Sequence, residues 1–135
     1  MSESQRTIAA DIRAASASIV EHVIKLALYP DAQECNHWRH EVYTFLNKVD
    51  RLKGKNKYPK KDFIYRWLST HNDIIDSFVA QITSDYAEDP KIIPISKLTA
   101  VVEEYQKWLS SELSTRGFVT SKDVYAELAH IVDNV

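Results

Sequence analysis

The chain is predicted to be an all-α, five-helix bundle, because apolar residues recur at helical spacing and glycine is nearly absent. The 135 residues include two glycines and four prolines, all of which fall between the periodic segments. A β-sandwich or a glycine-looped α/β enzyme needs more backbone freedom at its turns. No segment shows the sustained apolar–polar alternation that is typical of half-buried strands. We therefore expect one helical domain over residues 1–135, with mostly antiparallel neighbours because the connections are short.

The first predicted helix covers about residues 4–28, and the second follows a turn at Pro30. Asp31 is expected to cap the second helix, with Glu34 at the spacing of a capping box. Gly54 is well placed as the residue that ends it. The apolar stripe of the first helix is Ile8, Ile12, Ala15, Ile19, Val23 and Leu26, and that of the second is Trp38, Val42, Phe45, Val49 and Leu52.

The third predicted helix is the longest and runs from residue 59 or 60 to about residue 86. At 1.5 Å per residue it would be roughly 40 Å long, which suits a central helix of the bundle. Its apolar stripe consists of Phe63, Ile64, Trp67, His71, Ile74, Ile75, Phe78 and Ile82.

Two further helices complete the predicted bundle. The fourth begins at Pro94 or Ser96 and is closed by Gly117. The fifth begins at Thr120, with Asp123 three residues later in the position that caps a helix start. The fourth stripe is Leu98, Val102, Tyr105, Leu109 and Leu113, and the fifth is Val124, Leu128, Ile131 and Val132.

Composition excludes several classes of protein. The chain is 44% hydrophobic and 27% charged with a net charge of −2, which is typical of globular domains and not of disordered or wholly basic proteins. No apolar run approaches the roughly 20 residues that span a bilayer, so we expect no membrane partner. The polar N-terminus and the single cysteine, Cys35, favour a cytoplasmic location.

Residues 19–49 carry a short pattern at the end of the first helix and the start of the second. His22 and Lys25 precede the Tyr29-Pro30 turn, and Trp38-Arg39 opens the next helix. This pattern resembles an uncharacterised all-helical bacterial family, the domain of unknown function number twenty-nine. The resemblance implies a helical fold and carries no activity.

The strongest local anomaly is a basic segment at residues 51–66. It holds seven basic residues against one acid, a formal charge of +6, which leaves −8 for the rest of the chain. Such a segment attracts phosphates, and an anion bound at a helix start would explain lysines there. The alternative is a solvated turn that keeps the protein soluble. The candidate anion-binding residues are Arg51, Lys53, Lys55, Lys57, Lys60 and Lys61.

Arg66 and His71 form an Arg-x4-His pattern beside the basic segment. It resembles the signature of the HEPN superfamily, helical domains that include metal-independent ribonucleases. The resemblance implies that His71 would transfer protons and that Arg66 would stabilise the phosphate. The alternative is that His71 is a hydrogen-bonded core histidine, because its phase places it on the apolar stripe.

Metal and cofactor signals are weak. Two Glu-x-x-His spacings occur, Glu34/His37 and Glu127/His130, as in di-iron bundles. Their helical phases direct these side chains away from a shared centre, so we predict no metal and no cofactor. Glycine-rich phosphate loops and hydrolase motifs are missing from the sequence.

Tyr105 and Trp108 lie beside the stripe of the fourth helix and are candidates for a patch that binds a protein partner or a second copy. The alternative is that they belong to a tryptophan-rich core. Together these observations predict a small non-enzymatic binding or regulatory module. It would act through a helix face or through the basic 51–66 turn. The alternative function is an RNA-binding protein or HEPN-like ribonuclease that uses Arg66 and His71.

Overall fold

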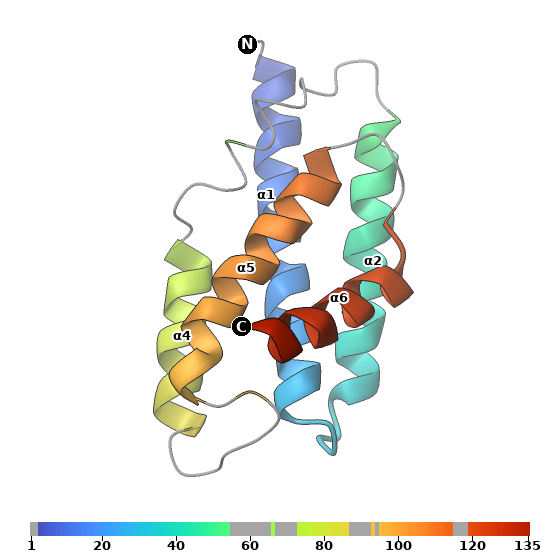
Figure 1. The fold of residues 1–135 in the computed structure, drawn as a ribbon. Helices are drawn as coiled ribbons and strands as arrows, with labels where there is room; N and C mark the ends of the chain where they lie inside the picture. Colours follow the sequence, from blue (N-terminus) through green and yellow to red (C-terminus); the bar gives the residue numbers. More distant parts are fainter. Residues whose placement is uncertain (1–2, 55–65, 67–72, 87–92, 94, 115–118) are drawn as a thin grey trace.

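The computed structural model describes residues 3–54, 66, 73–86, 93, 95–114 and 119–135 (Figure 1). These residues form helices and turns and contain no strand, which confirms the predicted all-α bundle. The helices are α1 (Glu3–Leu28), α2 (Cys35–Lys53), α4 (Asp73–Tyr86), α5 (Ile95–Ser114) and α6 (Ser121–Asn134). Among the helices described, none is long and apolar enough to cross a membrane.

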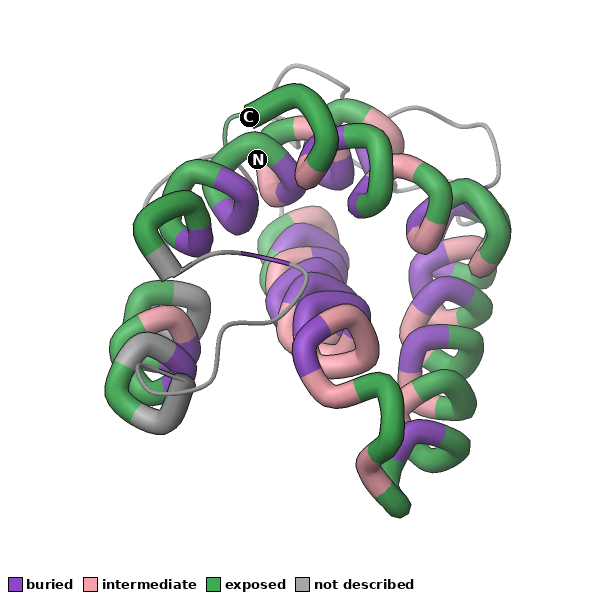
Figure 2. Tube along the Cα trace, turned by 60° about the horizontal axis from the view of Figure 1, so that its bottom comes forward, coloured by how far each residue is buried: buried purple, intermediate pink, exposed green. Residues whose placement is uncertain are grey.

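Helix α1 holds the central position among the described helices. It packs against α2, α4, α5 and α6, and Figure 2 shows it surrounded on three sides with much of its surface buried. The predicted stripe of α1 is buried, except that Leu26 is half-buried. The small residues Ala9, Ser16 and Ala17 are buried as well, which widens the buried arc beyond one stripe. Small side chains allow neighbouring helices to approach α1 closely.

The other helices pack around α1 in two ways. In Figure 1, α2 runs alongside α1 in the opposite direction, and α5 runs opposite to α4. Helix α6 instead crosses α1 and α2 obliquely, over their lower halves in this view, and also contacts α5. Because α6 crosses these two helices, it covers only part of the surface between them.

The predicted third helix is represented by its C-terminal part. Helix α4 begins at Asp73, Arg66 also has helical backbone, and the rest of residues 59–86 lies outside the described residues. Among the described helices, α4 packs mainly against α1 and α5. Phe78 and Ile82 are buried, as predicted. The central position of a long third helix stays a prediction, because most of that helix lies outside the described residues.

Helix α2 begins later than predicted. Its N-cap residue is Glu34, and no side chain caps the first turn. The prediction that Asp31 caps this helix is wrong, because a turn closed by the Ala32 N–H to the Tyr29 carbonyl (3.1 Å) occupies this position. The thiol of Cys35 is buried and donates to the Tyr29 carbonyl at 3.1 Å, which fixes the same turn. Gly54 ends the helix in a right-handed conformation, with φ of −73°.

The start of α6 is the predicted one. The Thr120 hydroxyl accepts from the Asp123 N–H at 3.2 Å, and the Asp123 carboxylate accepts from the Thr120 N–H at 3.1 Å. This reciprocal pair is a capping box. The predicted stripe of α5 is fully buried, and that of α6 is buried except for the half-buried Val132.

Candidate functional site

The described residues of the basic segment differ in their exposure. Arg51 in the last turn of α2 is exposed, and so is Arg66. Lys53 is buried, with 4% of its surface exposed. The remaining predicted anion-binding residues, Lys55, Lys57, Lys60 and Lys61, lie outside the described residues, as does His71.

The burial of Lys53 differs from the solvent-exposed position that is expected of an anion-binding residue. Its ammonium donates to the Glu112 carbonyl on α5 at 3.4 Å. Burial lowers the pKa of Lys53, and the Asp50 and Glu112 carboxylates partly oppose that shift. The last turn of α2 faces α5, so the lysine stem is covered by the bundle and its charge is directed inward.

Tyr105 is also placed differently from the predicted partner patch. Its side chain is fully buried, and its hydroxyl donates to the Val124 carbonyl on α6 at 2.9 Å. Burial raises the pKa of Tyr105 well above its ordinary value of 10.0, and the nearby Tyr125 and Glu127 raise it further. Of the two alternatives for Tyr105, the structure therefore agrees with the core position, because α6 covers this side of α5.

Trp108 is half-buried and packs on the Tyr105 ring, with the ring centroids 5.6 Å apart. It lines a surface hollow of about 480 Å³ between α5 and α6. Charged and polar groups dominate the rest of this hollow, including Glu104, Glu127 and His130. Trp108 is thus the partly exposed member of an aromatic pair, and Tyr105 is the member that lies in the core.

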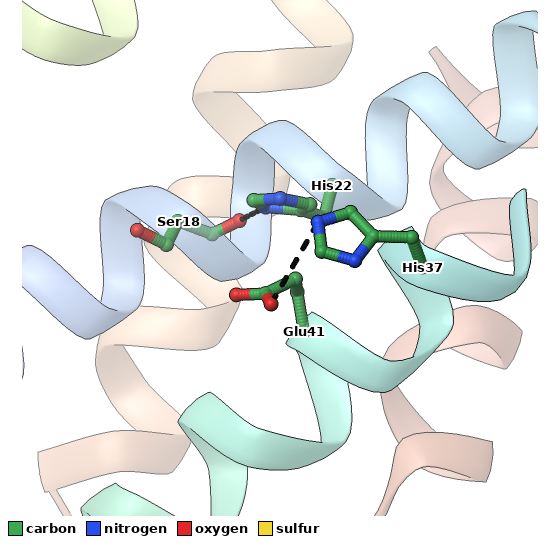
Figure 3. Close-up of polar contacts among 4 residues, drawn as sticks. All are labelled: Ser18, His22, His37 and Glu41. Carbon is green, nitrogen blue, oxygen red and sulfur yellow. Dashed lines mark hydrogen bonds and ion pairs between the residues drawn. The ribbon is translucent and has the colours of Figure 1, made fainter. Parts of the chain in front are cut away.

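Two histidines lie at the seam between α1 and α2 (Figure 3). The His22 Nδ1 lies 2.6 Å from the Ser18 carbonyl oxygen, which can only accept, so Nδ1 is the donor. The His37 Nε2 lies 3.8 Å from the Glu41 carboxylate on the exposed side of α2. Among the described residues, no group of three or more histidine, cysteine, aspartate or glutamate side chains gathers where a metal ion would bind.

Lys25 connects three helices through aromatic contacts. Its ammonium lies 5.9 Å from the ring centroid of Trp38 on α2 and 5.7 Å from that of Phe78 on α4. Each contact is within the range of a cation–π interaction. Burial raises the pKa of Glu21, and Lys25 and His22 oppose that shift. The polar residues on this side of α1 therefore contribute to the packing of α1 against α2 and α4.

The described surface also holds an apolar cleft of about 360 Å³ where α6 crosses α1 and α2. Its walls come from the C-terminal part of α1 and from one side of α6. Leu26, Ala27 and Val132 are half-buried, and Ala129 is exposed. The apolar lining residues are Val23, Leu26, Ala27, Leu128, Ala129 and Val132.

Three polar side chains border this cleft: Arg39 from α2, and Tyr125 and Asp133 from α6. Arg39 donates from Nη1 to the Asn36 side-chain oxygen at 3.2 Å. Burial raises the pKa of Tyr125, and the Arg39 guanidinium opposes that shift. An apolar depression bordered by a few polar groups is the usual form of a small-ligand site.

Helical periodicity did not predict this cleft. Leu26 and Val132 are the half-buried members of the otherwise buried stripes of α1 and α6. Arg39 and Asp133 read as ordinary surface charges until the crossing of α6 brings them to one cleft.

Comparisons with known proteins give no relative. No family model, no curated protein and no solved structure matches this chain.

Proposed function

We propose that this protein is a small non-enzymatic binding module whose binding face is the apolar cleft between α1, α2 and α6. The observation that carries the proposal is the lining of this cleft, in which aliphatic side chains from two helices remain half-exposed. A ligand that covers them would remove apolar surface from water, which stabilises a complex by about 25 cal/mol per Å² before the costs of association. This proposal selects the helix face over the basic turn.

The binding face is tested with octanol, a neutral amphiphile, followed by NMR of the methyl groups. We expect saturable shifts of Leu26 and Val132, because both line the cleft. Substitution of Ala129→Phe fills the cleft and should weaken binding at least ten-fold. Ala126→Phe is the matched control, since Ala126 is an exposed alanine on the same helix outside the cleft lining. Octanol that binds elsewhere, or equally to both variants, would contradict the proposal.

A second candidate function is polyanion binding by the basic segment, supported by its charge and by the exposure of Arg51 and Arg66. Counterion release makes such binding strongly dependent on salt. We expect Arg51→Glu to elute from heparin at lower salt than the wild type. The control is Lys48→Glu, the same charge change on α2 outside the segment. Absence of retention of the wild type at low salt would remove this candidate.

A further inference from the structure

One end of the apolar cleft carries two convergent hydrogen-bond donors. Arg39 is exposed and forms one described hydrogen bond, to the neutral side chain of Asn36. No carboxylate in the described part of the chain lies within ion-pair distance of its guanidinium. A guanidinium has five N–H donors, so most of its donors are open to a ligand.

The second donor is the Tyr125 hydroxyl. A phenol is protonated at neutral pH. Tyr125 and Arg39 both line the cleft, and Tyr125 belongs to the N-terminal half of α6, which lies over α2, the helix that carries Arg39 (Figure 1). A protonated phenol beside a guanidinium supplies two donors to one oxyanion, and hydrogen bonds to a charged group are the stronger kind. This end of the cleft is complementary to a negative charge.

The other end of the cleft has the opposite sign. Asp133 follows Tyr125 by eight residues on α6, which corresponds to about 12 Å along the helix. Between them, Leu128, Ala129 and Val132 provide an apolar wall. Asp133 repels an anion at its end, so a ligand with one negative group has one favoured orientation.

We propose that the cleft binds a linear alkyl carboxylate, with its carboxylate on Arg39 and Tyr125 and its chain along α6 toward Asp133. This inference rests on the proposed binding face and adds the chemical class of the ligand. The charge complementarity of the Arg39 end selects an anionic head over a neutral or cationic one, and the apolar walls select a hydrocarbon chain. An unbranched chain can follow the wall along α6 from Tyr125 toward Asp133.

The test compares three probes with the same chain, octanoate, octanol and octylammonium, by calorimetry at neutral pH. We expect octanoate to bind about ten-fold more tightly than octanol, because a hydrogen bond to a charged group contributes more than a neutral one. Octylammonium should bind more weakly than octanol. Lengthening octanoate to decanoate should tighten binding by about ten-fold while the chain remains inside the cleft.

The variants separate the headgroup from the chain. Arg39→Gln should reduce octanoate affinity to that of octanol, and Tyr125→Phe should reduce it several-fold, and both should weaken octanol binding much less because octanol carries no charge. Arg6→Gln, which replaces an exposed arginine on α1 outside the cleft lining, is the control and should change neither affinity.

Two results would overturn the inference. If octanol binds in the cleft and octanoate binds no more tightly, the carboxylate assignment is wrong and the proposed binding face stands. If neither probe binds, the inference and the proposed binding face both fail.

Discussion

The role of Tyr105 depends on the residues that surround it in the fold. Its hydroxyl joins α5 to the Val124 carbonyl of α6 inside the core, so it contributes to stability and not to partner binding. A buried hydrogen bond contributes about 1 kcal/mol to stability. We therefore expect Tyr105→Phe to lower the free energy of unfolding by about that amount, measured by urea denaturation at neutral pH.

The same substitution should change the alkaline pH dependence. Below pH 10.0 the Tyr105 phenol is protonated in both folded and unfolded chains, so its stabilising contribution is fully present. Above pH 10.0 the unfolded chain releases this proton and the folded chain retains it, because burial raises the folded pKa. The unfolding free energy of the wild type should fall there more steeply than that of Tyr105→Phe. Parallel pH profiles of the two proteins would contradict this account.

Lys53 shows the same dependence on surroundings for a charged residue. It lies in the last turn of α2, where a cation complements the helix dipole, and its side chain is buried against α5. The side chain belongs to the α2–α5 contact, and the charge of the basic segment that faces solvent is smaller than the sequence count indicates.

At the scale of elements, α2 and α6 differ in how the free backbone N–H groups of their first turns are capped. Helix α6 has a complete capping box at Thr120 and Asp123, and α2 has no side-chain cap. We expect Thr120→Ala to lower the unfolding free energy by about 1 kcal/mol. Asp31→Ala should change it by less than about 0.5 kcal/mol, because Asp31 lies in the turn before α2. Equal losses in the two variants, measured by denaturation, would show that this assignment of caps is wrong.

The crossing of α6 over α1 and α2 is the element-level feature that produces the apolar cleft. A helix aligned with α1 and α2 would cover more of the surface between them. The oblique position leaves Leu26 and Ala27 half-buried and brings Tyr125 and Arg39 to the same cleft. The candidate site is therefore a consequence of helix arrangement and not of a local motif.

At the scale of the whole molecule, α1 is the helix against which every other described helix packs. Ile19 lies on its stripe and is fully buried. Ile→Ala substitutions in such positions typically cost 2–5 kcal/mol, because the transfer free energy of the removed atoms is lost and a cavity is left behind. We expect Ile19→Ala to lower the midpoint of one cooperative unfolding transition. Tyr43→Ala is the control, because Tyr43 is 58% exposed and should unfold as the wild type does. Loss of only part of the helical signal would contradict the central role of α1.

The sequence by itself determined the helical class, most helix positions and the residues that face the core. These follow from local periodicity, and the buried stripes of α1, α5 and α6 match it closely, as does the Thr120 capping box. The cap at Asp31 was predicted wrongly because a turn held by the Cys35 thiol competes with it.

The packing of the helices was needed to show that α1 is central among the described helices, that Lys53 is buried, and that Arg39, Tyr125 and Asp133 border one cleft. Helical periodicity indicates which side of a helix is apolar, but it carries no information on the angle at which two helices cross. In this protein the crossing angle of α6 determines which surface of α1 and α2 is covered and which remains open as the apolar cleft. The fold class is therefore a local property of the chain, while the candidate site exists only after the helices have packed.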